Sequence, residues 1–194
     1  MSAVTLILIL VVVVVLLLAL FFASRRRAAQ RSEEQRERSR EEFGSEYERT
    51  AEERGSEEEA ERELRGRRGR VERRVEPLSE ESRGRFEEQW GEVERVFVDN
   101  PERSIEMADR TVSDALTERN FVSEAGQSDE ETERSLAVMH PDVADDYREA
   151  RRMRAEVVAR SAGRTDDDTN EESTEELRQA IRKYRAVYQR LVQQ

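Results

Sequence analysis

The residues of this chain that could do chemistry are few, and they do not form a known catalytic motif. His140 is the single histidine, and its place before Pro141 favours a helix cap or a surface contact over a general base. Ala137 stands three residues before it, so the Glu-x-x-His pair of carboxylate-bridged metal centres in four-helix bundles is missing. The chain has no cysteine, which excludes a disulfide, a thiolate zinc site and a thiol nucleophile.

Short segments that resemble known ligand or catalytic loops fail on their spacing. Asp166, Asp168 and Asn170 match the first ligands of a calcium-binding loop. Glu171 stands where that loop needs glycine and Leu177 where it needs the bidentate acid, so a solvated acidic loop is favoured. No glycine-rich phosphate loop or nucleophile elbow is found. The sequence therefore predicts no catalytic residue, no metal site and no cofactor.

The most decisive segment is the apolar run at residues 3–23, which contains one hydroxyl group and no charge. Its length matches the hydrocarbon core of a bilayer, about 30 Å, and three arginines follow it at residues 25–27. It is too long for a cleaved signal peptide, and Phe21 would stand where the cleavage site needs a small side chain. We therefore predict a transmembrane helix. The arginines place the N-terminus outside and the domain that follows in the cytoplasm, with the inverted topology as the alternative.

Residues 24–76 are predicted to form a charged helical stalk next to the membrane. Opposite charges recur three and four positions apart, which supports a solvated helix. The apolar positions are too few to sustain a heptad pattern, which leaves a projecting helix, a weak coiled coil and a partly disordered segment as alternatives. Gly44, Gly55 and Gly66 recur every eleven residues and are expected points of bending.

The pattern changes in residues 77–194, where amphipathic segments can bury a core. With no alternating strand pattern, the chain is predicted to be all-α: a transmembrane helix, a long charged membrane-proximal helix and a compact four-helix C-terminal bundle. The polar stretches 118–133 and 161–172 are predicted loops. Residues 76–194 hold 18 basic and 30 acidic side chains, a net charge of −12, which disfavours nucleic acid as a partner.

Capping residues mark where the helices of this bundle begin. Ser79, followed by two glutamates, begins the first helix, and Asn100 with Pro101 begins the second. The third is expected to start at the His140-Pro141 pair. The fourth is expected to start at the capping box of residues 173–176.

Aromatic residues on the apolar faces of these helices are candidate anchors of the core or of an interaction surface. They are Trp90, Phe86, Phe97, Tyr147, Tyr184 and Tyr188. The spacing of Trp90 from its aromatic neighbours favours burial, whereas an exposed Trp90 would indicate a docking site for a partner helix. Arg178 and Arg182 face away from the apolar stripe of the last helix and are expected to be solvated.

Several short segments along the soluble part form a specific combination, although each is weak alone. They are residues 43–50 (FGSEYERT), 77–79 (PLS), Arg85-Phe86, Trp90, 97–99 (FVD), Ala108-Asp109, His140-Pro141, Tyr147-Arg148, 173–180 (STEELRQA) and Tyr184-Arg185. In them the chain resembles an uncharacterised family of bacterial single-span membrane proteins. The resemblance implies the architecture of anchor, stalk and helical domain, and it implies no activity. The chain departs from the family in the loop before His140 and near Asp166.

Three functional hypotheses follow from this organisation. The favoured one is a membrane-anchored, non-enzymatic protein-interaction or scaffold module whose acidic bundle binds another protein. The alternatives are an accessory or regulatory subunit of a membrane complex, whose transmembrane helix makes contacts of its own, and an enzyme with an unrecognised site. A homo-oligomer is compatible with the sequence.

Overall fold

The regular structure in the described part of this chain is helical. The computed structural model describes residues 33–122, 128–161 and 171–193, and it contains no strand in these residues. The predicted all-α class is confirmed there. No helix within these ranges combines the length and the apolar character that a membrane crossing requires. The predicted transmembrane helix, residues 3–23, lies outside the described residues.

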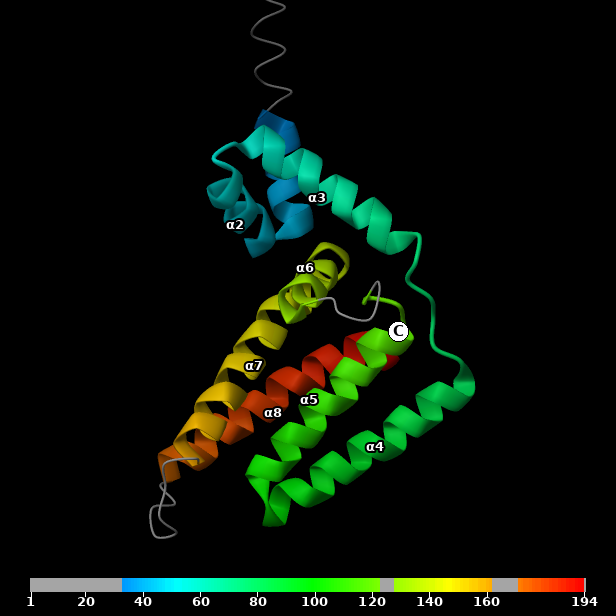
Figure 1. Ribbon diagram of the computed structural model, residues 1–194, viewed down its shortest axis with the longest axis vertical. Helices are drawn as coiled ribbons and strands as arrows, with labels where there is room; N and C mark the ends of the chain where they lie inside the picture. The colour runs from blue at the N-terminus through cyan, green and yellow to red at the C-terminus, as the bar shows by residue number, and fades with distance from the viewer. Residues whose placement is uncertain (1–32, 123–127, 162–170, 194) are drawn as a thin grey trace, which may run out of the picture. The chain divides into compact units, whose positions relative to one another are not determined.

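The chain divides into two compact units, and the second begins at Phe43. The described residues of the first unit, 33–42, are helical. The helices of the second unit are α2 (Ser45–Arg54), α3 (Glu57–Glu72), α4 (Glu80–Asp99), α5 (Pro101–Glu118), α6 (Asp129–Met139), α7 (Pro141–Ser161) and α8 (Glu171–Val192) (Figure 1).

Helices α2 and α3 form a hairpin that turns at Gly55. This glycine has a φ of 69°, in the left-handed region that disfavours side chains, and its N–H donates to the carbonyl oxygen of Ala51 at 2.8 Å. Gly44, with a φ of 54°, turns the chain before α2, whereas Gly66 lies inside α3. Of the three glycines expected as points of bending, Gly44 and Gly55 therefore interrupt the helix and Gly66 does not. The long membrane-proximal helix expected here is interrupted at both of them.

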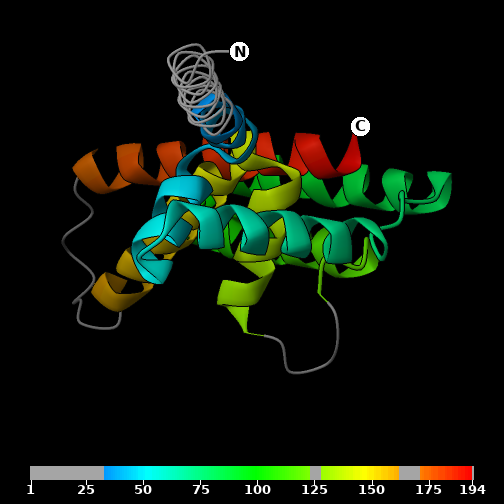
Figure 2. The same cartoon turned by 90° about the horizontal axis from the view of Figure 1, so that it is seen from above.

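The α2–α3 hairpin packs on its neighbours. Five apolar residues of the hairpin and of the chain just before it are at most 1% exposed: Phe43, Tyr47, Ala60, Leu64 and Val71. Helix α3 contacts α6, and α2 contacts both α6 and α7 (Figure 2). Two apolar stripes too short for a coiled coil are sufficient here, because each only has to cover one side of an adjacent helix. The boundary that the sequence placed at residue 76 therefore differs from that of the compact unit, which begins at Phe43.

Helices α4 and α5 begin where the capping residues predicted. The Ser79 hydroxyl accepts a hydrogen bond from the N–H of Ser82 at 3.1 Å. The side-chain oxygen of Asn100 accepts one from the N–H of Arg103 at 3.0 Å, and Pro101 is the first residue of α5. Each cap satisfies a backbone donor that the helix itself leaves free.

Two predicted boundaries are corrected by the structure. Helix α6 begins within the predicted loop at residues 118–133, where the Ser128 hydroxyl accepts from the N–H of Glu131 at 3.3 Å. Serine followed by acidic residues is the signal that identified α4, but here the apolar run behind it is short. Helix α8 begins at Glu171, so Ser173 lies inside the helix and not at its cap.

Helix α8 is the centre of the bundle that it forms with α4, α5 and α7. It packs on both α5 and α7, as Figure 1 shows, while α4 packs on α5. The buried side chains of α8 are Leu177, Ala180, Tyr184, Val187, Tyr188, Leu191 and Val192. The predicted helical bundle is therefore present, and α6 adds a helix that the sequence analysis did not predict.

A buried carboxylate links the α2–α3 hairpin to α7. The Glu46 side chain is 2% exposed and pairs with Arg49 of its own helix, with Arg67 of α3 at 3.4 Å and with Arg148 of α7 at 3.2 Å. Burial alone would lower the pKa of Arg148, but its hydrogen bond to Asp145 and the charges of Asp145 and Glu46 outweigh burial and raise it. Three guanidinium groups thus converge on the Glu46 carboxylate, and each also pairs with a second carboxylate: Glu53, Glu63 or Asp145.

Replacing Glu46 by glutamine should destabilise the fold by about 2 kcal/mol, because three guanidinium groups lose a shared carboxylate although each keeps a second one. The free energy of unfolding can be measured on the full chain in detergent, from the emission of the single tryptophan, Trp90, during urea denaturation. Glu80→Gln, at a side chain that is 92% exposed, is the matched control and should change it by less than about 0.5 kcal/mol. Equal effects would show that Glu46 contributes no more than a surface charge.

Candidate interaction groove

The structure buries most of the aromatic residues that the sequence selected as anchors. Phe86, Trp90, Tyr147, Tyr184 and Tyr188 are all buried, with Trp90 the most exposed of them at 6%. Phe97, the remaining candidate, is only partly buried and packs at the edge of the core. Two of these residues, Trp90 and Phe97, reach the surface at the junction of α4 with α8.

Trp90 ties α4 to α8. Its ring stacks on that of Tyr188, with centroids 4.5 Å apart and planes at 16°. The indole N–H donates to the Glu94 carboxylate at 2.8 Å, and the same carboxylate pairs with Arg185 of α8. The indole is therefore fixed on its face and at its polar edge.

A groove of about 290 Å³ runs along this junction between α4 and α8. It is lined by Trp90, Glu94, Phe97, Ile181, Arg182 and Arg185. Half of these side chains are apolar and half are charged. The volume is at the lower end of that of small-molecule sites, which begin at about 300 Å³.

Helix α8 brings excess positive charge to this groove. Arg178 and Arg182 are 55% and 67% exposed, and both pair with the carboxylate of Glu175, at 3.4 and 3.1 Å. Two guanidinium groups thus share one carboxylate. Both arginines were expected to be solvated. The sequence carries no signal that Arg182 borders a groove, because the opposite wall comes from a distant segment of the chain.

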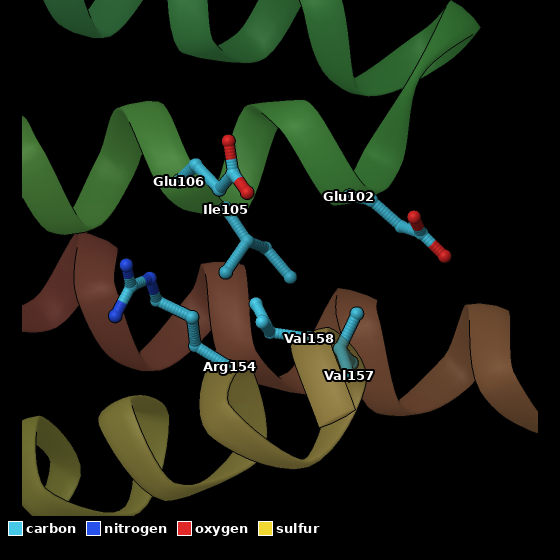
Figure 3. Close-up of a pocket in the computed structure, with 6 residues that line it drawn as sticks. All are labelled: Glu102, Ile105, Glu106, Arg154, Val157 and Val158. Atoms are coloured by element: carbon cyan, nitrogen blue, oxygen red, sulfur yellow. The ribbon is translucent and has the colours of Figure 1, made fainter. Parts of the chain in front are cut away.

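A smaller cavity of about 100 Å³ lies between α5 and α7. It is lined by Glu102, Ile105, Glu106, Arg154, Val157 and Val158 (Figure 3). Figure 3 shows Ile105 and Val158 extending toward each other from the two helices, with Arg154 and Glu102 on opposite sides of them. A space of this size holds a few water molecules and no cofactor.

Asp109, next to this cavity, links three helices of the bundle. It accepts a hydrogen bond from the Tyr184 hydroxyl at 3.0 Å and lies 3.6 Å from Arg151 and 3.5 Å from Arg154. Burial, followed by the charge of Asp109, raises the pKa of Tyr184. The phenol thus stays protonated and holds α8 to α5, which is a structural role.

His140 lies at the junction of α6 and α7. Its Nδ1 accepts a hydrogen bond from Arg190 at 3.1 Å, which requires the neutral ring with its proton on Nε2. Burial, followed by the charges of Arg190 and Arg119, lowers the pKa of His140 to about 4. His140 ends α6, and α7 begins at the next residue, Pro141, where a helix start was predicted.

Metal-binding residues do not cluster in the part of the chain that the structure describes: no three His, Asp or Glu side chains there could hold an ion together. The calcium-like residues Asp166, Asp168 and Asn170 lie outside the described ranges.

Comparison of the chain with models of known families, with curated proteins and with solved structures gave no match. The resemblance to bacterial single-span membrane proteins stays a prediction from the sequence.

The low pKa of His140 predicts a specific pH dependence of stability. The unfolded chain takes up the imidazole proton near pH 6.5 and the folded chain only near pH 4, so protonation favours the unfolded state and stability falls as the pH drops through this window. Between pH 7.5 and 5 the loss due to His140 should be about 2 kcal/mol. His140→Asn, which keeps an acceptor for Arg190 but does not titrate, should lack this part of the loss.

Urea denaturation of both proteins at the two pH values, followed by Trp90 emission, measures the difference. Equal losses in the wild type and in His140→Asn would contradict the assignment.

Proposed function

We propose that this chain is a single-pass membrane protein whose cytoplasmic helical domain is a non-enzymatic module that binds another protein. The observation that carries the proposal is the α4–α8 groove, in which the apolar side chains of α4 and α8 lie beside Arg182 and Arg185. The apolar run at residues 3–23 supports the membrane anchor, and the arginines at residues 25–27 support a cytoplasmic location for the domain.

The composition of the groove favours a protein ligand. An amphipathic helix that docks in a groove inserts apolar residues and leaves its charged residues at the rim. Trp90, Phe97 and Ile181 offer the apolar contacts, and Arg182 offers a charge at the rim. Tryptophan and arginine are also the residues that most often dominate binding energy at protein interfaces.

The fold shortens the tether that this function would use. The compact unit begins at Phe43, so residues 24–42 connect it to the predicted anchor, in place of the stalk of residues 24–76.

Single cysteines in the otherwise cysteine-free chain test the membrane topology. A membrane-impermeant maleimide should label Ser2→Cys in intact cells and Gln194→Cys only after permeabilisation, because the arginines at residues 25–27 stay inside. The protein should also remain in the membrane pellet after alkaline extraction. Labelling of Gln194→Cys in intact cells, or release of the protein, would contradict the proposed arrangement.

A photo-cross-linking residue at position 98 tests the groove. The side chain of Val98 is 82% exposed and follows Phe97, whereas Val158, 46% exposed on α7, is the control position away from the groove. We expect a cross-linked protein from position 98 only. Arg182→Glu should lower its yield about tenfold, equivalent to about 1.4 kcal/mol of binding free energy.

Exchange of residues 3–23 for an unrelated transmembrane segment separates an anchor from an accessory subunit. An anchor only has to hold the domain at the membrane, so the product from position 98 should survive the exchange. Loss of the product would favour the subunit of a membrane complex, and equal products from positions 98 and 158 would contradict a specific groove.

A further inference from the structure

We propose that the partner of the α4–α8 groove is a second copy of this chain. The proposal rests on the proposed function, since it names the occupant of the same groove. It follows from how charge and exposed apolar surface are distributed along the two helices that line it.

The edge of the groove that α4 provides is acidic. Glu87, Glu94 and Val98 are exposed and are spaced by seven and four residues, so they lie along one face of α4. Of the two carboxylates, Glu94 lines the groove. Burial raises the pKa of Tyr188 to about 12, and the charges of Glu87 and Glu94 add to this rise. Gly91 lies between them, and a side chain there would meet nothing within 4 Å. In the described residues this face of α4 is therefore open.

The edge that α8 provides is basic. From Leu177 to Val192, α8 carries five basic side chains and no acidic one. Arg182 and Arg185 line the groove, with Arg185 paired to Glu94 of its own copy, and Arg178 lies one turn before Arg182 on α8. The two edges thus have opposite sign, although residues 76–194 as a whole have a net charge of −12.

These edges complement each other when two copies meet about a two-fold axis that runs along the groove. That rotation places α4 of one copy over α8 of the other, and the reverse, so an acidic edge faces a basic edge on both sides of the axis. A two-fold axis that lies in the interface but runs across the groove would instead place α4 of one copy on α4 of the other, and α8 on α8. Like charges would then face each other. The charge pattern therefore selects one symmetric arrangement.

Val98 supplies the apolar contact in this arrangement. The Trp90–Tyr188 stack and the Glu94–Arg185 ion pair show that α4 and α8 run antiparallel along the groove. Val98 is therefore level with residues 178–182 of α8, and the two-fold axis places it over those residues of the second copy. There its side chain, 82% exposed in one copy, becomes covered.

The net charge of the chain opposes association only weakly at this surface. Repulsion between distant charges is screened over about 8 Å at physiological ionic strength, whereas the two facing edges are in contact. Two copies anchored in one membrane also meet at a raised effective concentration.

Disulfide formation between two tagged versions of the full chain in membranes tests the proposal. One version carries Val98→Cys and the other Arg182→Cys, and the natural chain has no cysteine to interfere. Under mild oxidation the mixed pair should give a product at least tenfold more abundant than either version alone, because the axis along the groove brings position 98 over position 182. Val158→Cys with Arg152→Cys, two exposed positions on α7, is the matched control pair and should give no product.

Reversal of charge at Arg178 provides a second measurement. Its side chain is 55% exposed, so the substitution should leave the fold intact. Arg178→Glu added to the Arg182→Cys version should lower the mixed product at least fivefold. An unchanged yield, or a yield equal to that of the α7 control pair, would overturn the proposal. Should position 98 photo-cross-link a different protein while the mixed disulfide fails to form, the second copy is excluded and the interaction module stands. If neither the photo-cross-linked product nor the mixed disulfide forms, both the interaction module and the second copy as its partner are excluded.

Discussion

The apolar face of α8 is the feature on which the rest of the domain depends. Helices α5 and α7 pack on α8 far more than on each other, and the Trp90 ring of α4 stacks on Tyr188. The tyrosines of α8 bury their rings and still satisfy polar groups, as the hydrogen bond from Tyr184 to Asp109 shows. Because one helix supplies the shared surface, loss of its side chains would separate all of its neighbours at once.

This use of α8 also explains why its outer surface is basic. The buried side of the helix is apolar, so all of its charge lies on the side facing out, and from Leu177 onward that charge is positive. Neighbouring helices provide the compensating carboxylates: Glu94 of α4 pairs with Arg185, and Asp146 and Glu149 of α7 pair with Lys183. Carboxylates from α4 and α7 thus neutralise the middle of α8, while among the side chains that the structure describes Arg178 and Arg182 both pair with Glu175.

Local signals in the sequence were sufficient to predict where helices begin, but not which helices pack against one another. Ser79 and Asn100 begin helices because each caps backbone donors within its own turn, and such signals need no knowledge of the fold. The α2–α3 hairpin was predicted as a stalk because its apolar stripes are short and its attachment depends on Arg148, about a hundred residues away from Glu46. The groove was missed for the same reason, since its two walls meet only in three dimensions.

The rigidity of the groove decides what kind of binding it can support. Trp90 is held by its stack on Tyr188 and by its hydrogen bond to Glu94, so in the proposed complex a docking side chain would meet a surface that needs little ordering. The exposed arginines would still have to be ordered, and their charges would favour one orientation of the proposed partner over others more than they would add affinity. A groove of about 290 Å³ buries few side chains, so the affinity of a single contact is modest. Attachment to a membrane would compensate for this weakness, because it raises the local concentration of partners without any new contact.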